Sequence, residues 1–535
     1  QESFVPLFDG ASLSGWESAD ENIWRVENGS IVGGALDQPT PQNSYLFFEE
    51  EFDDFELRLQ FLLQGFPKQG MINSGVQFRS EQVNGGGARG YQADIGDPTW
   101  WGSLYDEHRR DRVLASSDMN VLGPSLNREG WNDYAIRCEG PRVRLWINGI
   151  LTVDYLEQDS KVPQAGKIAF QLHSGGPVQV SFREITLAKI TPIKSPRTPS
   201  QEQASFRVPD GFVVELVASE ESGLPKPITV QFDDAGRMWS MTATEYPLDA
   251  NENPAKASEL WQRGGKDRVV YFDNPCEPGP HPAKTFADGL AMPMGLLPWE
   301  NGVILGQGSE ILFLEDESGD GQADKRRTLL TGFGVQDSHL MPHQFTLMPS
   351  GWIAMAQGAF NFSKVIAGKN KPVEFNYCKL GRFLPDGSKF EIIGYGFNNI
   401  WGLAVGREGE VFIQEANDMK YSVVPFQNGA TYPGIGNEKF RPYSPISSPI
   451  ADFYLGGTGL SGLALSDNRS GGFPDPWASV MFVANPITGT INAVKVSNTE
   501  SGEYSATRLP DFLTSADGWF RPIAISFGPD GCLYV

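Results

Sequence analysis

Polar side chains recur at alternate positions in three segments of the N-terminal third, over 73–79, 91–94 and 171–173. Alternate residues of a strand share one face, so such strands would line a sheet with amides, carboxylates and aromatic rings. Sugars bind to surfaces of this kind, because their hydroxyls need polar partners and their C–H faces stack on rings. The pattern therefore indicates a carbohydrate site, with an ordinary solvated sheet face as the alternative.

Titratable groups for acid–base chemistry lie in and beside the second segment. A charged, aromatic stretch over 100–112 suits a loop that covers the same face, and a plain solvated loop is the alternative. The candidate catalytic residues are Asp94, Asp97, Glu107 and His108. The candidate substrate-binding residues are Asn73, Arg79, Tyr91, Gln92, Tyr105, Arg109, Gln171 and His173. We expect Asp94 and His173 to project from neighbouring strands into one groove, with Arg79 and Gln92 nearby.

Short oxygen-bearing side chains also alternate through a second region of the chain. They belong to Asp316, Ser318, Asp320 and Asp324. Oxygens at alternate positions of a tight turn converge on one cation, and Gly321 permits the turn. The spacing predicts a Ca²⁺-binding loop, with an unoccupied acidic turn as the alternative. Arg327 stands where an EF-hand has its last ligand, which excludes that motif.

A third group of polar residues is dispersed and contains two of the five histidines. Its members are Glu245, His339, His343, Asn398 and Asn399. These residues lie far apart in the sequence, so they form a site only if repeated structure brings them together. Structural histidines are the alternative.

Composition bounds the partners and the compartment. A net charge of −23 and a pI near 4.7 make nucleic acid and anionic membranes poor partners. No run approaches 18 apolar residues, so no membrane span is predicted. The chain begins at Gln1 without Met, as a secreted or periplasmic protein does after signal cleavage.

The four cysteines stand singly, at Cys138, Cys276, Cys378 and Cys532. There is no C-x-x-C pair for a zinc ribbon and no C-x-x-C-H motif for covalent haem. An oxidising compartment would allow one disulfide, Cys276 to Cys378, and buried free thiols are an equal alternative.

Period-2 patterns dominate residues 1–190 and predict a β-sandwich. Phe55, Leu57, Leu59 and Phe61 alternate with polar residues, as in a half-buried strand. Asn148-Gly149 lies between two such runs and is a hairpin signal. Many strands of this spacing, without long helical patterns, favour a two-sheet jelly roll.

A different organisation follows a Pro-rich stretch over 191–205, which is predicted to be an extended linker. Over 206–535 an apolar strand, a turn with Gly and a second apolar strand recur. The copies cover 230–240, 296–306, 345–355, 403–413, 463–484 and 525–535. Such spacing is typical of propeller blades, so a six-bladed β-propeller is expected. The last copy ends in mid-strand, which predicts an incomplete propeller with further downstream domains or a redox partner.

The repeat register gives the dispersed polar group a common place. His343 lies two residues before the strand that begins at Phe345, with His339 one short turn earlier. Glu245 follows the corresponding strand of the first copy, and Asn398 and Asn399 precede that of the fourth. Since innermost strands and their entry loops face the central channel of a propeller, all five are predicted to converge near one mouth.

Ten motifs in order make the first 185 residues resemble the 3-keto-disaccharide hydrolase domain family. They include L-F-D-G-A-S-L-S-G-W (7–16), N-S-G-V-Q-F-R (73–79), G-Y-Q-A-D-I-G-D (90–97), W-N-D-Y (131–134), W-I-N-G (146–149) and Q-L-H (171–173). The resemblance implies a concanavalin-like sandwich. It also implies cleavage of glycosidic bonds in sugars oxidised at C3, by hydrolysis or by elimination and hydration. The family usually has Glu at the position of Gln92 and Gln at that of Asp94, so the acid here stands elsewhere on the strand.

The propeller region resembles the dehydrogenase-like propellers of large secreted bacterial proteins. The motifs are A-T-E-Y-P (243–247), G-F-G-V-Q-D-S-H-L-M-P-H (332–343), G-F-N-N-I-W-G-L (396–403) and G-G-T-G-L-S-G-L (456–463). Such propellers are distantly similar to quinone-dependent glucose and sorbosone dehydrogenases, in which a channel His takes the sugar hydroxyl proton. Those enzymes have an Arg-Asn pair where this chain has Asn398-Asn399, which leaves a PQQ-like quinone without that anchor.

Together these features predict an extracytoplasmic carbohydrate-processing protein that cleaves 3-keto-glycosides in its N-terminal sandwich. A non-catalytic sugar-binding module on a scaffold propeller is one alternative. A quinone-dependent sugar dehydrogenase acting through the propeller is another. A catalytic site needs two titratable groups within about one sugar ring of each other, whereas a binding module does not.

Overall fold

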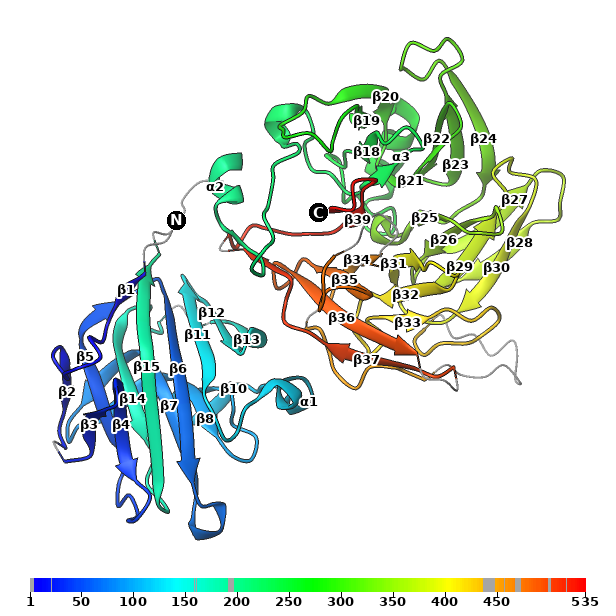
Figure 1. Ribbon diagram of the computed structural model, residues 1–535. Coiled ribbons are helices and arrows are strands. Elements are labelled where there is room, and N and C mark those ends of the chain that lie inside the picture. The colour runs from blue at the N-terminus through cyan, green and yellow to red at the C-terminus, as the bar shows by residue number, and fades with distance from the viewer. Residues whose placement is uncertain are drawn as a thin grey trace. The chain divides into compact units, whose positions relative to one another are not determined.

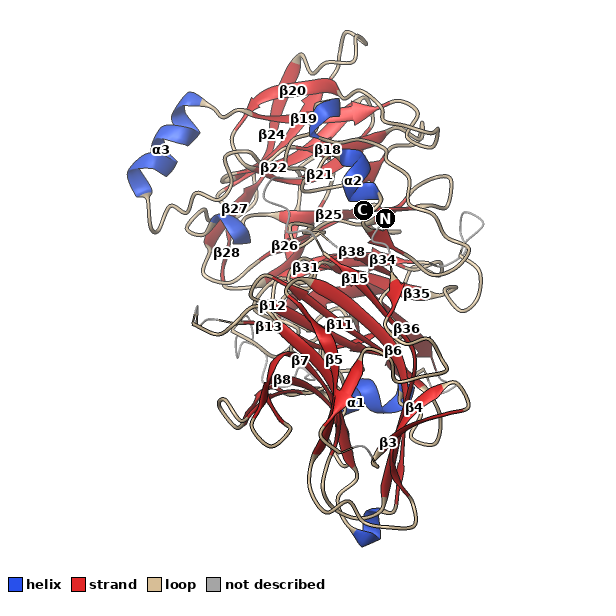
Figure 2. Ribbon diagram, turned by 90° about the vertical axis from the view of Figure 1, so that its left-hand side faces the viewer, coloured by secondary structure: helices blue, strands red, loops and turns tan. Residues whose placement is uncertain are grey.

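The computed structural model describes residues 4–20, 22–157, 159, 161–190, 197–435, 448–456, 458–466, 473–498, 502–515 and 517–535. The chain divides into two compact units, residues 1–196 and 197–535, drawn in blue to cyan and in green to red in Figure 1. Strands dominate both units (Figure 2), so the all-β prediction is confirmed. The longest described helix, α3 (Pro254–Arg263), has 10 residues, and no described helix is long and apolar enough to cross a bilayer.

The first unit is a sandwich of two antiparallel sheets. The eight-stranded sheet contains β1 (Val5–Pro6), β3 (Trp24–Glu27), β4 (Ser30–Ala35), β6 (Phe55–Gly65), β11 (Asn132–Glu139), β12 (Arg142–Ile147), β13 (Ile150–Leu156) and β15 (Val178–Lys189). The seven-stranded sheet has the order β10 (Arg112–Ala115), β9 (Leu104–Glu107), β8 (Gly87–Gly96), β7 (Asn73–Val83), β14 (Gly166–Leu172), β5 (Ser44–Phe52) and β2 (Trp16–Ser18).

Aromatic rings hold the two sheets together. Phe170 of β14 stacks on Phe182 of β15, with ring centroids 3.9 Å apart, and on Trp16 of β2 at 4.8 Å. The alternation predicted in β6 holds, since Phe55, Phe61 and the leucines between them are at most 3% exposed. Period-2 patterning therefore turns one face of each sheet into the core.

The described residues of the second unit form six blade sheets. The first sheet contains β17 (Gln231–Phe232), β18 (Met238–Met241), β19 (Asp267–Phe272) and β20 (Lys284–Leu290). The second contains β21 (Pro293–Trp299), β22 (Gly302–Gln307), β23 (Glu310–Glu315) and β24 (Lys325–Thr331), and it is extended by β27 (Phe362–Ala367) and β28 (Val373–Asn376). The third contains β25 (His343–Leu347), β26 (Ile353–Gln357), β29 (Lys379–Phe383) and β30 (Phe390–Tyr395), and the fourth contains β31 (Ile400–Val405), β32 (Val411–Glu415) and β33 (Val424–Pro425). The fifth sheet contains β34 (Ser461–Leu465), β35 (Val480–Asn485), β36 (Thr490–Asn498), β37 (Tyr504–Arg508), β38 (Leu513–Ser515) and β16 (Phe206–Arg207). The sixth contains β39 (Ser526–Phe527) and β40 (Leu533–Tyr534).

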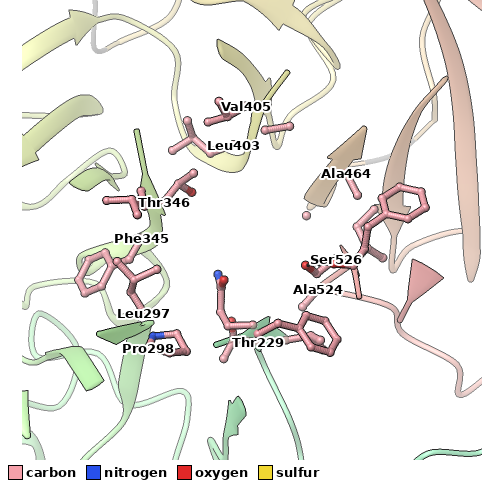
Figure 3. Close-up of a pocket in the computed structure, with 18 of the residues that line it drawn as sticks. Thr229, Leu297, Pro298, Phe345, Thr346, Leu403, Val405, Ala464, Ala524 and Ser526 are labelled. Atoms are coloured by element: carbon pink, nitrogen blue, oxygen red, sulfur yellow. Dashed lines mark hydrogen bonds between the residues drawn. The ribbon is translucent and has the colours of Figure 1, made fainter. Parts of the chain in front are cut away.

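Each predicted repeat supplies the innermost strand of one sheet, which confirms the six-bladed architecture. Successive innermost strands contact one another from β17 to β39, and the rings of Phe232 and Tyr534, 4.9 Å apart, join the first sheet to the sixth. The innermost strands surround a cavity of about 800 Å³. Figure 3 shows side chains from all six strand regions around it, among them Thr229, Leu297, Thr346, Leu403, Ala464 and Ser526.

Part of the predicted extended linker is helical instead. Residues 191–196 lie outside the described residues, but α2 (Pro199–Gln203) is a short helix. Thr198 accepts a hydrogen bond from the backbone of Gln201, and the Gln201 side chain accepts one from the backbone of Thr198. This capping box, with Pro199 in the first turn, favours a helix over an extended chain.

The predicted disulfide from Cys276 to Cys378 is wrong, because all four cysteines are free. Cys378 is fully buried in an apolar cluster of the third and fourth sheets, where burial raises the pKa of its thiol. Cys276 is exposed, and its sulfur accepts a hydrogen bond of 3.7 Å from the hydroxyl of Tyr534. The two thiols thus belong to different parts of the propeller.

The acidic loop between β23 and β24 is closed by its own backbone. Asp316 accepts hydrogen bonds from the N–H groups of Gly319, Asp320 and Gly321, and Asp324 accepts those of Glu317 and Ser318. In the described structure the carboxylates of Asp316, Asp320 and Asp324 do not meet at one point where a single ion could bind them. The predicted Ca²⁺ loop, including Ser318, gains no geometric support, because these carboxylates serve as loop caps.

We predict that Arg79→Ala destabilises the sandwich strongly. Arg79 is paired with Asp54 at 2.7 Å, and the two side chains are 1% and 8% exposed. Removal of one partner of a buried pair leaves the other charge uncompensated and costs about 3–5 kcal/mol. Urea unfolding of the full chain, followed by tryptophan fluorescence, measures the loss.

The matched control is Arg89→Ala, since Arg89 pairs with Glu81 on the same sheet but both side chains are exposed. An exposed pair contributes about 0–1 kcal/mol, so this variant should unfold almost like the wild type. Equal effects of the two substitutions would contradict the structural role of Arg79.

Candidate active site

One face of the seven-stranded sheet carries the predicted polar residues. Gln171 of β14 lies opposite Gly75 of β7, which in turn lies opposite Asp94 of β8. Gln92 lies opposite Tyr105 of β9. Neighbouring residues of β14 alternate, so Phe170 points into the core and Gln171 points away from the other sheet.

Amide groups on this face lead to the carboxyl group of Asp94. Nε2 of Gln77 donates a hydrogen bond of 2.6 Å to Oε1 of Gln92, and Nε2 of Gln92 donates one of 2.6 Å to Oδ1 of Asp94. Asp94 is only 3% exposed. Burial raises its pKa from 3.8 to about 8, with a smaller contribution from the charge of Glu107, while the hydrogen bond from Gln92 opposes the shift. The carboxyl group therefore keeps its proton at neutral pH.

A second carboxyl group, that of Glu107, lies on the neighbouring strand β9. The hydroxyl of Tyr45 donates to it at 3.2 Å, and Nε2 of Gln171 donates to that hydroxyl at 3.2 Å. Nε2 of His108 lies 3.4 Å from Oε1 of Glu107. Burial raises the pKa of Glu107, whereas His108, Tyr45 and His173 act in the opposite direction.

Two polar atoms on this face are buried without a hydrogen-bond partner among the described residues. They are Oδ1 of Asn73 and Oε1 of Gln171. Buried acceptors without partners cost free energy, so they point to a ligand or water that donates to them. Acceptor oxygens beside a protonated carboxyl group suit the hydroxyls of a sugar.

The structure thus brings together ten polar residues from five strands and their adjoining loops. They are Tyr45, Asn73, Gln77, Gln92, Asp94, Tyr105, Glu107, His108, Gln171 and His173. The sequence analysis did not single out Tyr45 or Gln77. Tyr45 begins an apolar run that is typical of a core strand, whereas Gln77 stands at an alternate position of the segment 73–79, where it could have been found.

Four predicted site residues lie elsewhere. Arg79 has a φ of 44° at a register shift of β7, which turns its guanidinium to Asp54. Tyr91 points to the opposite face from Gln92, and its hydroxyl donates to Glu157 at 2.5 Å. Arg109 pairs with the fully buried Asp106. Asp97 accepts hydrogen bonds from Arg128 and Trp101 in a loop.

The five residues predicted for the propeller channel do not line its cavity as described. His343 is fully buried, with its ring nitrogens 2.5 and 2.7 Å from carbonyl oxygens of Met341 and Ile400, and burial lowers its pKa. Glu245 pairs with Arg263 at 2.8 Å. The ring of His343 bonds to the backbone because this residue begins β25 and is buried between neighbouring segments.

The two asparagines do not fit a quinone site. The backbone N–H groups of Asn398 and Asn399 both donate to Glu415, and Oδ1 of Asn398 accepts from the backbone of Ile435. A quinone carboxylate needs a cation or free donors, and these two backbone donors already serve a carboxylate of the protein, while the side-chain amide of Asn398 donates to the sulfur of Met419. We therefore derive no dehydrogenase step from the propeller.

Two family models match the chain. Residues 198–535 match the family described as "Domain of unknown function (DUF7133)". The chain belongs to this family. Residues 3–188 match the model described as "3-keto-alpha-glucoside-1,2-lyase-like domain", which confirms the resemblance found in the sequence. No match was found among curated proteins.

Solved structures are similar to parts of the chain. A putative glycosyl hydrolase from Parabacteroides distasonis is 17% identical, with a TM-score of 0.27, over 36% of this chain and 95% of its own. A putative oxidoreductase (glucose dehydrogenase) from Thermus thermophilus is 18% identical, with a TM-score of 0.41, over 61% of this chain and 92% of its own. The PQQ domain of a pyranose dehydrogenase from Coprinopsis cinerea is 15% identical, with a TM-score of 0.38, over 62% of this chain and 94% of its own.

We predict that the proton of Asp94 makes stability depend on pH. Unfolding exposes a carboxyl group that ionises near pH 3.8, whereas the folded protein keeps the proton to about pH 8. The folded state therefore binds more protons between these values, and the free energy of unfolding falls as pH rises from about 4 to about 8. Asp94→Asn should flatten this fall, as measured by melting temperatures at pH 5 and pH 8.

The control is Asp97→Asn, which removes a carboxylate paired with Arg128 in a partly exposed loop. This variant should keep the wild-type decline of stability with pH. A wild-type slope in Asp94→Asn would show that Asp94 ionises normally in the folded protein.

Proposed function

We propose that the sandwich cleaves 3-keto-glycosides by acid–base chemistry, in an extracytoplasmic compartment. One observation carries the proposal: two carboxyl groups of raised pKa, Asp94 and Glu107, lie on one face of adjacent strands. A pair of this kind offers one acid and one base. The lyase-like family model supports the choice of substrate.

The ketone at C3 makes the C2 proton acidic. Glu107 takes this proton, and the electron pair of the C2–H bond forms an enediolate with the ketone oxygen. When the enediolate collapses, the C1–O bond breaks, and Asp94 gives its proton to the departing oxygen. Water then adds to C1 of the unsaturated product to give the 3-keto-sugar. Proton exchange with solvent restores both carboxyl groups.

The surrounding groups orient the reactants. Gln92 holds Oδ1 of Asp94, which leaves Oδ2 to carry the transferable proton. The hydroxyl of Tyr45 and Nε2 of His108 both contact Oε1 of Glu107, and these contacts orient the carboxylate. The free acceptors of Asn73 and Gln171 would bind sugar hydroxyls.

We predict that Asp94→Asn and Glu107→Gln each slow aglycone release about 100-fold or more, because a positioned acid or base contributes 10²–10⁴-fold. The full chain is incubated with a 3-keto-α-glucoside that has a chromogenic aglycone. Asp97→Asn is the control and should keep the wild-type rate. Binding of the sugar without release by the wild type would contradict catalysis and favour a binding module.

Elimination and direct hydrolysis differ at C2. Elimination removes the C2 proton and later restores one from solvent, so cleavage in D₂O should give 3-keto-glucose with one deuterium at C2. Mass spectrometry of product isolated early measures its deuterium content. The control for spontaneous exchange is 3-keto-glucose kept in D₂O without protein. Product without deuterium beyond that control would contradict the proposed order of steps.

A further inference from the structure

A cluster of metal-ligating side chains belongs to the second unit and not to the sandwich. Asp249, Asp337 and His339 each have one ligand atom within 4.8 Å of the others. Nδ1 of His339 lies 3.0 Å from Oδ1 of Asp337 and 3.7 Å from Oδ1 of Asp249. His339 belongs to the short 3₁₀ turn η4 (Ser338–Leu340) that precedes β25, and Asp249 follows β18.

Hydrogen bonds from neighbouring residues hold Asp249 and Asp337 in place. The backbone and hydroxyl of Ser338 both donate to Oδ1 of Asp249. The side chain of Asn361 accepts from the backbone N–H of Asp337 at 2.9 Å and donates to its carbonyl oxygen at 3.1 Å. Outer groups of this kind fix metal ligands before the ion arrives.

The separations between the ligand atoms match those of a small transition-metal ion. With metal–ligand bonds of about 2.0–2.2 Å, neighbouring atoms of a tetrahedral site are about 3.3–3.6 Å apart. The observed separations of 3.0 and 3.7 Å lie on either side of this range. Modest side-chain adjustment would therefore satisfy an ion.

Charge and surroundings also favour a cation. The only ion pairs of Asp249 and Asp337 in the described structure are with His339, so two carboxylates share one imidazole. The ring of Tyr246 lies edge-on to His339, at 5.1 Å, and packs with the apolar residues Met292 and Met341. An apolar wall weakens the screening of the two negative charges, while the half-exposed His339 leaves room for a further ligand.

We propose that Asp249, Asp337 and His339 bind one divalent transition-metal ion, of the Zn²⁺ or Co²⁺ class. One imidazole with two carboxylates suits such ions, whereas Ca²⁺ takes oxygen ligands alone. Three protein ligands leave a coordination position open to water or to a substrate oxygen. The site is distinct from the acidic loop after β23, whose carboxylates do not converge on one point in the described structure.

The test is titration of the full, chelator-treated chain with Co²⁺, followed by its visible absorption, and with Zn²⁺, followed by calorimetry. We expect one ion per chain, and His339→Gln and Asp249→Asn should each weaken binding at least tenfold. The control is His281→Gln, which removes a partly exposed propeller histidine whose Nε2 bonds to the Glu277 carbonyl oxygen. It should bind like the wild type.

Melting temperatures provide a second readout. Zn²⁺ should raise that of the wild type and the control but not those of the two site variants, because only a folded site gains binding energy. Without metal, all four proteins should show the same propeller fold by circular dichroism. Absence of binding by the wild type, or equal binding by the site variants, would overturn the proposal.

Discussion

The stacking of Phe170 between Trp16 and Phe182 is the contact on which the candidate active site depends. Side chains of a strand alternate between its two faces, so a ring fixed in the core fixes its neighbour Gln171 on the other face. A slip of one residue would exchange the two faces of β14. Through the pairing of β14 with β7 and of β7 with β8, this register also places Gln77, Gln92 and Asp94.

The buried carboxyl group of Asp94 gives that face its chemistry. Its neighbours along the strands are amides, which supply hydrogen bonds without charge, so burial rather than ion pairing determines its protonation. The resemblance leads one to expect an acid at position 92 and an amide at position 94, and here the two are exchanged. Because Gln92 and Asp94 bond to each other on one face, the exchange moves the acid along the strand but keeps the pair.

The sequence predicted the elements better than the side-chain environments. Alternation and turn signals gave the sandwich, and repeated strand–turn–strand units gave all six innermost propeller strands. Arg79 was misplaced because a regular strand would put it beside Gln77, whereas the shift in β7 and its positive φ reverse its direction. Local patterns do not reveal such a break. His343 shows the same limit. The repeat located its strand, but it did not reveal the two backbone carbonyl groups that bond to its ring nitrogens.

The central claim is that a neutral carboxyl group faces the substrate side of the seven-stranded sheet. Infrared difference spectra between the wild type and Asp94→Asn isolate the C=O stretch of a protonated Asp94. The account predicts a protonated-carboxyl band that persists at pH 7 and disappears as pH rises through about 8. A difference spectrum that shows only carboxylate at pH 7 would contradict it.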